Sequence, residues 1–399
     1  QDWHYWGDLG WGPHWDPAYY PNPEDMVTEL HRLHMQLMVS VWSKFDNTTD
    51  FYTRMRAQHH IIPGSLYYDP YSEAARQLFY SFSNHSMFRI GVDALWLDAT
   101  EPEGFPHLGQ ELAAGSGNEY ANTYSLMTTA AIHDQYVKDY PTLRPFSLTR
   151  SSFAGQQRTG AALWSGDTCG TWDMLQRQVV ASLNYGLSGI PYWSMDIGGF
   201  FRPDNQYSDS GYIELLTRWF QVGAFVPVFR VHGGNSHTEV WNYGDTFLRN
   251  FLTVDHLRYR LLPYTYSGFF SVFSDGYTMQ RALVFDFAHD TGARQVADQF
   301  MWGPCIMVCP VLQPNATARP VYLPAGSTWT DFWTGSPVTA AGGSSFSTPA
   351  PVGEIPLFVR AGTFVLLGPK QQYSDEKPAD PIELRLYKRT SRHSSSSSS

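Results

Sequence analysis

The chain has few cysteines and few charged residues for its length. Three cysteines, Cys169, Cys305 and Cys309, occur among 399 residues; they are too few for a disulfide framework, and no CxxC spacing with histidine partners indicates structural zinc. The formal net charge is −10, and no lysine and arginine cluster is present to neutralise phosphates, which disfavours nucleic acid. No uninterrupted apolar run reaches the roughly 20 residues of a membrane helix. We therefore expect no metal or other cofactor, no nucleic-acid partner and no membrane partner.

Aromatic residues are abundant by comparison. They make up 16% of the chain, the same share as the charged residues, and 43% of all residues are hydrophobic. This balance suits a protein that places tryptophan and tyrosine around a neutral polar ligand, although an aromatic-rich core accounts for most of these residues. The length exceeds what one core usually holds, so we expect a large domain and a smaller one.

Segments of helical character alternate with short apolar runs in the first two thirds of the chain. The expected helices are residues 21–35, 72–88, 118–140, 171–185, 210–222 and 254–274. The expected strands are residues 37–42, 90–98, 145–150, 161–167, 190–196 and 226–232. Alternation of strand and helix at this spacing is typical of parallel βα units.

Each expected strand ends in side chains that suit a ligand site. These are Trp42 with Lys44, Asp98, Arg150, Asp167, Asp196, and Arg230 with His232. Because the carboxyl ends of the parallel strands of a barrel converge at one face, where catalytic groups lie, the pattern predicts a (β/α)8 TIM barrel with a site at that face. We assign residues 1–275 to this barrel.

Helical periodicity stops near Thr278. Short apolar runs between proline and glycine turns follow, at residues 281–287, 303–310, 321–324, 329–333 and 356–362. This pattern predicts a β-sandwich domain over residues 276–367. Its tryptophans lie in strand-like contexts, where core packing is their ordinary use, so we expect the domain to support the barrel.

Two carboxylates in the barrel region meet the demands of glycoside hydrolysis. A retaining glycosidase needs two carboxyl groups about 5–5.5 Å apart, one as the nucleophile and one as the acid/base. Asp98 and Asp167 each follow an apolar run that contains a tryptophan, Trp96 or Trp164. Partial desolvation would raise the pKa of Asp167, as a general acid requires. Asp196 has a similar placement, so the residues alone do not rank it below Asp167.

Several stretches together resemble glycoside hydrolase family 31, in the right order and at sensible spacing from Gln1 to about Pro369. The stretches are residues 96–102 (WLDATEP), 149–158 (TRSSFAGQQR), 164–168 (WSGDT), 192–200 (YWSMDIGGF), 229–233 (FRVHG) and 322–335 (YLPAGSTWTDFWTG). The opening QDW, the stretch VWSKF at residues 41–45 and residues 97–102 resemble the α-xylosidase-like members more than the maltase-like ones.

The resemblance implies a retaining α-glycosidase that acts through a covalent β-glycosyl-aspartate, most simply one that releases α-linked xylose from oligosaccharides or glycosides. It implies Asp98 as nucleophile and Asp167 as acid/base. Further implied roles are sugar binding by Asp2, Arg150 and His232, aromatic walls from Trp42, Trp96 and Trp164, with Phe200 or Trp193 completing them, and support from Glu101 and Asp196. The alternatives are an α-glucosidase, an α-transglucosylase or a lyase of the same family, and an inactive or carbohydrate-binding relative.

The chain departs from the family pattern at both ends. Family members carry an N-terminal β-sandwich and the first barrel strands before the region that Gln1 opens, and a fuller distal β domain after the last matched strand. We expect residues 368–399 to form only the start of that distal domain and a disordered serine-rich tail. We therefore expect a barrel that lacks its first strand and most of its second. Because such a barrel exposes strand edges and apolar core, we expect residues 1–399 alone to have low or no activity.

Overall fold

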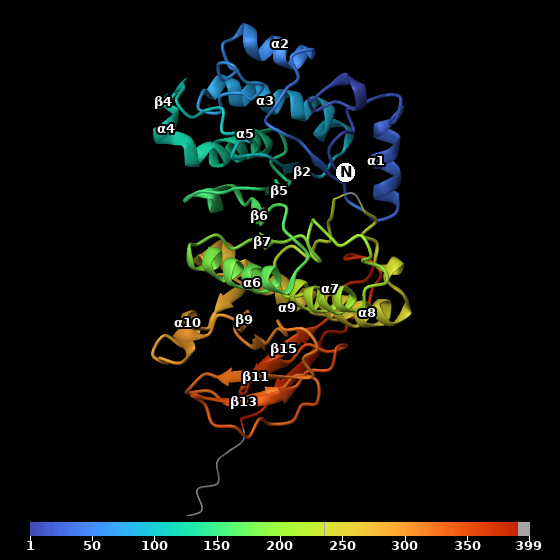
Figure 1. Cartoon of the computed structure of the whole chain (residues 1–399), viewed down its shortest axis with the longest axis vertical. Coiled ribbons are helices and arrows are strands. Elements are labelled where there is room, and N and C mark those ends of the chain that lie inside the picture. Colours follow the sequence, from blue (N-terminus) through green and yellow to red (C-terminus); the bar gives the residue numbers. More distant parts are fainter. Residues whose placement is uncertain (235, 390–399) are drawn as a thin grey trace, which may run out of the picture. The chain divides into compact units, whose positions relative to one another are not determined.

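The computed structural model describes residues 1–234 and 236–389. These residues form two compact units, one of Gln1–Ser165 and one that begins at Gly166 (Figure 1). Each unit has a hydrophobic core of its own, which contains Val39, Leu95 and Phe79 in the first and Met301, Met307 and Phe358 in the second. In the described parts of the chain, no helix has the length and hydropathy needed to cross a membrane.

A parallel sheet organises the first unit. Its strands pair in the order β1, β2, β5, β6. All residues of β2 are buried, as expected for a strand covered on both faces. The strands are β1 (Met38–Ser40), β2 (Ala94–Leu97), β5 (Ser147–Thr149) and β6 (Ala162–Trp164). Four expected strands therefore form where the apolar runs lie, each shorter than its run because pairing ends where the chain turns into its loops.

Helices cover this sheet, and side-chain caps fix where two of them begin. Ser72 accepts a hydrogen bond from the backbone N–H of Ala75 at the start of α3, and Thr49 does the same for Tyr52 in α2, which satisfies donors that have no partner inside the helix. The α-helices are α1 (Pro23–Arg32), α2 (Asp50–Ala57), α3 (Glu73–Ser86), α4 (Gly117–Tyr120) and α5 (Tyr124–Asp139). The smaller elements are η1 (Gly7–Leu9), η2 (Phe88–Ile90), η3 (Ala121–Thr123), η4 (Gln156–Thr159) and the hairpin of β3 (Glu111–Leu112) and β4 (Gly115–Ser116).

The second unit begins with a short strand and long helices. These are α6 (Trp172–Leu187), β7 (Trp193–Ser194), α7 (Ser210–Gly223), η5 (Val240–Tyr243), α8 (Asp245–Arg260) and α9 (Leu262–Asp275). The prediction of a single helix over residues 254–274 was wrong, because α8 ends at Arg260 and α9 begins at Leu262. Pro263 lies in the first turn of α9, a position that proline favours because it has no N–H to donate.

The strand expected over residues 226–232 was also wrong. Within the described residues this stretch makes only an isolated parallel bridge, between Val231 and Ile197. Pro227 cannot donate a ladder hydrogen bond, and Arg258 instead uses its guanidinium to bind the carbonyl oxygens of Ala224, Val226 and Pro227. The stretch is therefore held both by the Arg258 side chain and by two backbone hydrogen bonds beside β7, from Val228 N–H to the Trp193 carbonyl oxygen at 3.1 Å and from Ile197 N–H to the Arg230 carbonyl oxygen at 3.4 Å. This pairing is too sparse to make a continuous strand.

Antiparallel sheets complete the second unit, in agreement with the predicted β-sandwich. One sheet has the order β12, β14, β10, β9, β8, and two hairpins are formed by β11 with β13 and by β15 with β16. The strands are β8 (Gln280–Ala282), β9 (Phe300–Trp302), β10 (Ile306–Val308), β11 (Ala318–Leu323), β12 (Trp329–Asp331), β13 (Ser344–Pro349), β14 (Leu357–Arg360), β15 (Thr363–Leu367) and β16 (Glu383–Tyr387). The expected strand at 281–287 becomes β8 followed by α10 (Leu283–Asp286), and η6 (Ala293–Gln295) precedes β9.

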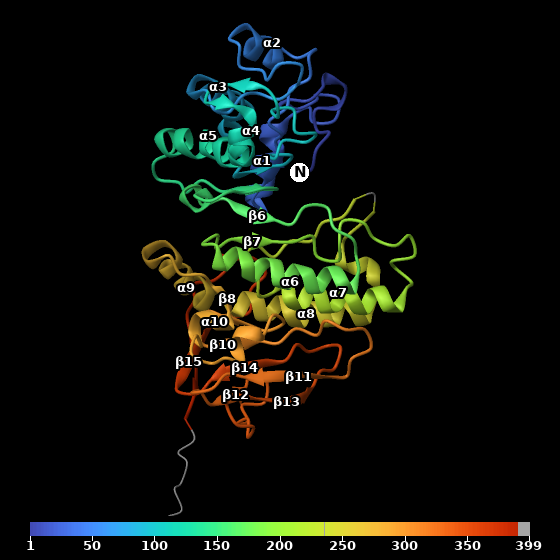
Figure 2. The same ribbon diagram turned by 60° about the vertical axis from the view of Figure 1, so that its left-hand side comes forward.

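A buried arginine joins the helices of the second unit to these sheets. Arg218 on α7 is 1% exposed, and burial lowers its pKa. The neighbouring Gln221 donates to the carbonyl oxygen of Val352 at 2.7 Å. Figure 2 shows α7 lying between β7 and the antiparallel strands. The acceptors of the Arg218 guanidinium are the carbonyl oxygens of Ala316, Ala350, Pro351 and Glu354 and the side chain of Gln221.

We predict that Arg218→Ala lowers the free energy of unfolding by about 3 kcal/mol or more, because several buried carbonyl groups lose their donor. Chemical denaturation followed by tryptophan fluorescence measures this. Arg177→Ala is the matched control: its ion pair with Asp173 has both side chains at least 70% exposed, and such pairs contribute less than about 1 kcal/mol. Equal losses from the two substitutions would contradict the prediction.

Candidate functional site

The strongest cluster of predicted site residues in the first unit lies where β2 and β5 end. Leu97 pairs with Thr149 in the parallel register, so the next residue on each strand, Asp98 and Arg150, emerges at the same edge of the sheet. Arg150 Nη1 lies 3.2 Å from Asp98 Oδ1, and Arg150 Nη2 lies 2.5 Å from Glu101 Oε1. One guanidinium therefore holds two of the predicted acids.

The loop after β2 fixes the Asp98 side chain further. The backbone N–H of Ala99 donates to Asp98 Oδ1 at 2.7 Å, and Ala99 adopts a φ of +50°, which is uncommon for a residue with a Cβ. Thr100 Oγ1 lies 2.7 Å from Thr149 Oγ1. This contact holds the loop against the end of β5. Asp98 is 8% exposed, and its carboxylate is oriented by the backbone N–H of Ala99 and by the Arg150 guanidinium.

Tryptophan rings surround this cluster. Trp96 and Trp164 form an edge-to-face pair with centroids 5.6 Å apart, and the Arg150 guanidinium carbon lies 6.0 Å from the Trp42 ring. Trp11, which sequence reasoning did not select, has its ring 4.4 Å from that of Trp42. Trp11 lies in a glycine-rich loop far from the expected strands, so the strand pattern gave no reason to select it.

Two further predicted residues lie beside β1. The carbonyl oxygen of Gln1 accepts a hydrogen bond from Ser40 at 2.9 Å, and Asp2 follows, with its Oδ1 accepting from the backbone of Trp3 at 2.7 Å. The ammonium of Lys44 lies 4.3 Å from the Trp11 ring centroid, a cation–π distance. Lys44 is therefore ordered against an aromatic ring.

Tyr67 is a site neighbour that sequence reasoning missed. It makes an isolated bridge with Lys44 and is 5% exposed. Burial raises its pKa, with the carboxylates of Glu103, Glu101 and Asp98 acting in the same direction and Arg150 opposing them. A tyrosine in a long loop, with Tyr68 directly after it, carries no sequence signal of this placement.

The second unit holds another buried acid with its own arginine. Asp196, which follows β7, is 0% exposed and accepts a hydrogen bond from Arg230. Burial raises the pKa of Asp196 to about 6, against the opposing effect of Arg230 and with a further increase from the Asp167 carboxylate. Asp167 itself is exposed, whereas the sequence analysis expected it to be partly desolvated; it lies in a loop where Gly166 has a φ of +72°.

His232 is held in a neutral form. Burial lowers its pKa to about 3, assisted by the positive charges of Arg230 and Arg202. Its ring centroid lies 5.4 Å from that of Phe200, and its carbonyl oxygen accepts from Arg202 at 3.0 Å. A neutral imidazole both donates and accepts hydrogen bonds, so His232 suits recognition of a hydroxyl group. Arg202 had not been selected from the sequence.

The predicted site residues are therefore divided between the two units, and their roles stay predictions. The first unit holds Asp2, Trp42, Trp96, Asp98, Glu101, Arg150 and Trp164, and the second holds Asp167, Asp196, Phe200 and His232. Among residues 1–234 and 236–389, no group of three or more histidine, cysteine, aspartate or glutamate side chains has the arrangement of a metal site.

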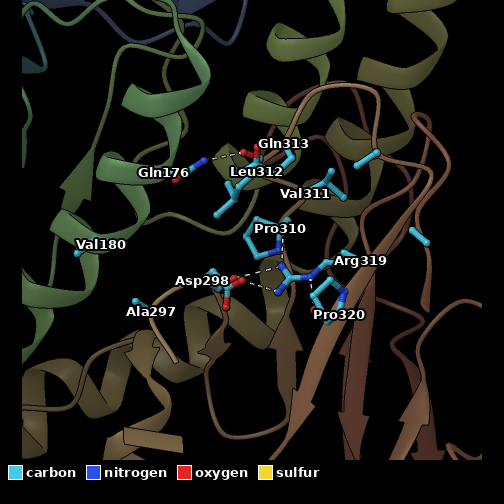
Figure 3. A pocket seen from close by; sticks show the side chains of 12 residues that line it. Gln176, Val180, Ala297, Asp298, Pro310, Val311, Leu312, Gln313, Arg319 and Pro320 are labelled. Atoms are coloured by element: carbon cyan, nitrogen blue, oxygen red, sulfur yellow. Dashed lines mark hydrogen bonds and ion pairs between the residues drawn. The ribbon is translucent and has the colours of Figure 1, made fainter. Parts of the chain in front are cut away.

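A cavity of about 320 Å³ in the second unit lies apart from these residues (Figure 3). It is bordered by α6 and by the segments before β9 and around β11. Arg319 pairs with Asp298 at 2.9 Å on one side, and Gln176 donates to the carbonyl oxygen of Leu312 at 3.0 Å on the other. Because its polar groups already bind one another, the cavity presents no chemistry for catalysis.

Comparison with known proteins identifies both parts of the chain. Residues 1–268 match the model of the "Glycosyl hydrolases family 31 TIM-barrel domain". Residues 276–365 match that of the "Glycosyl hydrolase family 31 C-terminal domain".

Individual relatives agree with these matches. An α-xylosidase of Saccharolobus solfataricus is 39% identical over 394 residues, covering 97% of this chain and 53% of the relative. Alpha-glucosidase 2 of Bacillus thermoamyloliquefaciens is 33% identical over 310 residues, covering 75% of this chain and 38% of the relative. The crystal structure of a GH31 α-xylosidase from Xanthomonas citri superposes with a TM-score of 0.88 at 36% identity, covering 97% of this chain and 45% of that one. The chain thus spans about half the length of such relatives.

The raised pKa of Asp196 predicts a pH-dependent contribution to stability. The pKa of Asp196 is raised from its ordinary value of 3.8 to about 6. Between pH 3.8 and about pH 6 the folded protein therefore keeps a proton that the unfolded chain releases, and the contribution of Asp196 to the free energy of unfolding falls as the pH rises. We predict that Asp196→Asn gains up to about 3 kcal/mol relative to the wild type between pH 4 and pH 7, because the asparagine never ionises. Urea unfolding at a series of pH values measures this difference.

The matched control for this measurement is Asp204→Asn, which changes an exposed aspartate of the same unit. Its stability difference from the wild type should stay constant over the same pH range. A constant difference for Asp196→Asn as well would contradict the prediction.

Proposed function

Because the chain belongs to glycosyl hydrolase family 31, we propose that it provides the catalytic residues of a retaining α-glycosidase. The observation that carries this proposal is the Asp98 carboxylate, fixed at the carboxyl end of a buried parallel strand with the Arg150 guanidinium 3.2 Å away. Such a rigid and buried carboxylate suits nucleophilic attack on an anomeric carbon.

In the proposed first step, a carboxylate oxygen of Asp98 forms a bond to the anomeric carbon. The bond from that carbon to the leaving oxygen breaks, and Asp167 gives its proton to this oxygen. In the second step, Asp167 takes a proton from water, the water oxygen attacks the anomeric carbon, and the bond to Asp98 breaks. Two inversions at that carbon leave the α configuration unchanged, and both carboxyl groups return to their starting protonation.

Buried polar atoms near Asp98 support a hydroxyl-rich ligand. Trp42 Nε1 and Glu101 Oε2 are both buried and have no hydrogen-bond partner among the described residues, although such groups are normally satisfied. A sugar supplies hydroxyl groups that both donate to a carboxylate and accept from an indole N–H. The tryptophan rings beside them offer apolar faces for the sugar ring.

In the second unit, His232 supports the same proposal. The lowering of its pKa to about 3 keeps its imidazole neutral at ordinary pH, so it binds a hydroxyl group without bringing a positive charge. Asp196 is proposed to support rather than to catalyse, because its carboxylate oxygen is already bonded to Arg230. This assignment leaves Asp167, which is exposed in the loop before α6, as the acid/base.

For the substrate, we propose an α-linked xyloside. The support is the α-xylosidase name of the relative that is 39% identical and of the superposed crystal structure. An α-glucoside is the second candidate, favoured by the relative named alpha-glucosidase. The two sugars differ by one hydroxymethyl group, which discriminates by only about 1–3 kcal/mol. Transfer to a sugar acceptor and elimination are alternative fates of the same intermediate, and product analysis distinguishes them from hydrolysis.

In a protein that contains this chain and has the full length of the family relatives, we predict that Asp98→Gly abolishes turnover of an aryl α-glycoside, with a loss of at least about 10⁴-fold in kcat. Added azide should rescue Asp98→Gly acting on an α-glycosyl fluoride and give the β-glycosyl azide, because azide then replaces the nucleophile. Rescue of Asp167→Ala by azide on an activated aryl α-glycoside should give the α-glycosyl azide. The anomeric configuration, read by NMR, separates the two roles.

The control for these variants is Asp93→Asn. Asp93 lies just before β2, at the opposite end from Asp98, and its carboxylate accepts a hydrogen bond from Leu37 at 2.7 Å. It should retain measurable hydrolysis without azide. Full activity of Asp98→Gly without azide would contradict the proposed nucleophile.

We predict a higher kcat/KM for nitrophenyl α-xyloside than for nitrophenyl α-glucoside, by about 10-fold or more. The two substrates are compared side by side on one preparation of a protein that contains this chain and has the full length of the family relatives. A clear preference for the glucoside would contradict the proposed substrate but would leave the two-carboxylate mechanism unaffected.

A further inference from the structure

An aromatic groove lies in the β-sandwich part of the second unit. Its volume is about 570 Å³, within the range of about 300–1,000 Å³ that is usual for ligand sites. None of the predicted catalytic residues borders it. The lining residues come from β12 with the turn after it and from β16 with the residue after it: Thr330, Phe332, Trp333, Thr334, Gly335, Pro337, Arg385, Leu386, Tyr387 and Lys388.

The turn after β12 holds the tryptophan of this groove in a fixed position. Asp331 Oδ1 accepts hydrogen bonds from the backbone N–H groups of Trp333 and Thr334, at 3.0 Å and 2.7 Å, and from Thr334 Oγ1 at 2.9 Å. The indole N–H of Trp333 donates to the carbonyl oxygen of Ile355 at 2.8 Å. Both ends of the residue are thus anchored, and little conformational entropy remains to be lost on binding.

The chemistry of the groove combines aromatic surface with hydrogen-bonding groups. Trp333 is half-buried, and its ring packs edge-to-face on Phe332 at 5.2 Å. Tyr387 is 6% exposed and completes the apolar floor. Thr334 and Lys388 are exposed at the rim, and Arg385 lies 5.7 Å from the Phe332 ring.

We propose that this groove is a non-catalytic binding site for a neutral oligosaccharide. A pyranose presents an apolar face, which fits a fixed tryptophan ring, and a rim of hydroxyl groups, which fit the ammonium donor of Lys388. An acidic ligand is less suited, because the Arg385 guanidinium is already paired with Glu383 at 2.5 Å. Binding at this groove requires no turnover, so the proposal does not depend on the roles proposed for the catalytic residues.

A second glycan site gives a physical advantage to an enzyme that acts on oligosaccharides. Binding one part of a long chain raises the effective concentration of the rest of that chain at the same molecule. The site is therefore expected to lower KM for long substrates and to leave KM for a nitrophenyl monosaccharide unchanged.

The test is calorimetric titration of the protein carrying Asp98→Ala, which prevents turnover, with two probes. The probes are an α-xylosylated β-glucan heptasaccharide and maltoheptaose. We expect Trp333→Ala to remove one binding site for at least one probe, or to weaken it by about 10-fold or more. The titration gives the number of binding sites, so the loss of one site in Trp333→Ala can be distinguished from binding of the probe at the proposed catalytic residues.

Phe273→Ala is the matched control, because Phe273 is an aromatic residue of the same unit that is 88% exposed and does not line the groove. It should bind both probes as the Asp98→Ala protein does. An unchanged number of sites and unchanged affinity in a folded Trp333→Ala protein would overturn the proposal.

Lys388→Ala keeps the proposal testable if Trp333→Ala does not fold, which circular dichroism detects. Lys388 is exposed at the rim, and we expect its removal to weaken the same site about threefold or more, as the loss of one hydrogen bond does. Unchanged affinity in this variant, with a misfolded Trp333→Ala, would overturn the proposal as well.

Discussion

The parallel register between β2 and β5 is the constraint on which the cluster of Asp98, Glu101 and Arg150 depends. It pairs Leu97 with Thr149 and so sets Asp98 and Arg150 side by side without any contribution from loop flexibility. The Thr100 and Thr149 hydroxyl groups, 2.7 Å apart, fasten the loop at the same point. A shift of one residue in this register would turn Asp98 to the other face of the sheet and separate it from its cation.

Three acids with arginine partners lie in two different environments. Asp98 and Glu101 share Arg150, and the buried Glu101 Oε2 has no protein partner in the described chain, an arrangement suited to a ligand. Asp196 is buried against Arg230, and burial raises its pKa to about 6. A group that is bonded and enclosed in this way is suited to positioning its neighbours. The residues alone had left Asp167 and Asp196 unranked; the supporting role proposed for Asp196, which is bonded to Arg230, leaves Asp167 as the proposed acid/base.

Much of the fold could be predicted from local patterns. The family comparisons confirm the TIM barrel followed by a C-terminal β domain, and Ser72 and Thr171 begin helices where they were expected. The expected strand at 226–232 was wrong because its apolar run resembles a buried strand, while the stretch makes only sparse backbone pairing beside β7 and two of its carbonyl oxygens, those of Val226 and Pro227, accept from Arg258. Hydrophobicity does not encode which group binds a carbonyl oxygen, so that outcome depends on tertiary contacts.

The same limit applies to the tryptophans of the β domain. The sequence analysis assigned them to core packing, and Trp329, which is 2% exposed, fits that assignment. Trp333, four residues later, lies beyond the strand, where Asp331 turns the chain and leaves the ring half-buried beside a groove. Periodicity alone would place both rings in a strand. The two tryptophans differ in burial because the Asp331 carboxylate accepts three hydrogen bonds and turns the chain after Trp329. Trp329 is therefore a core residue, whereas Trp333 is a candidate binding platform.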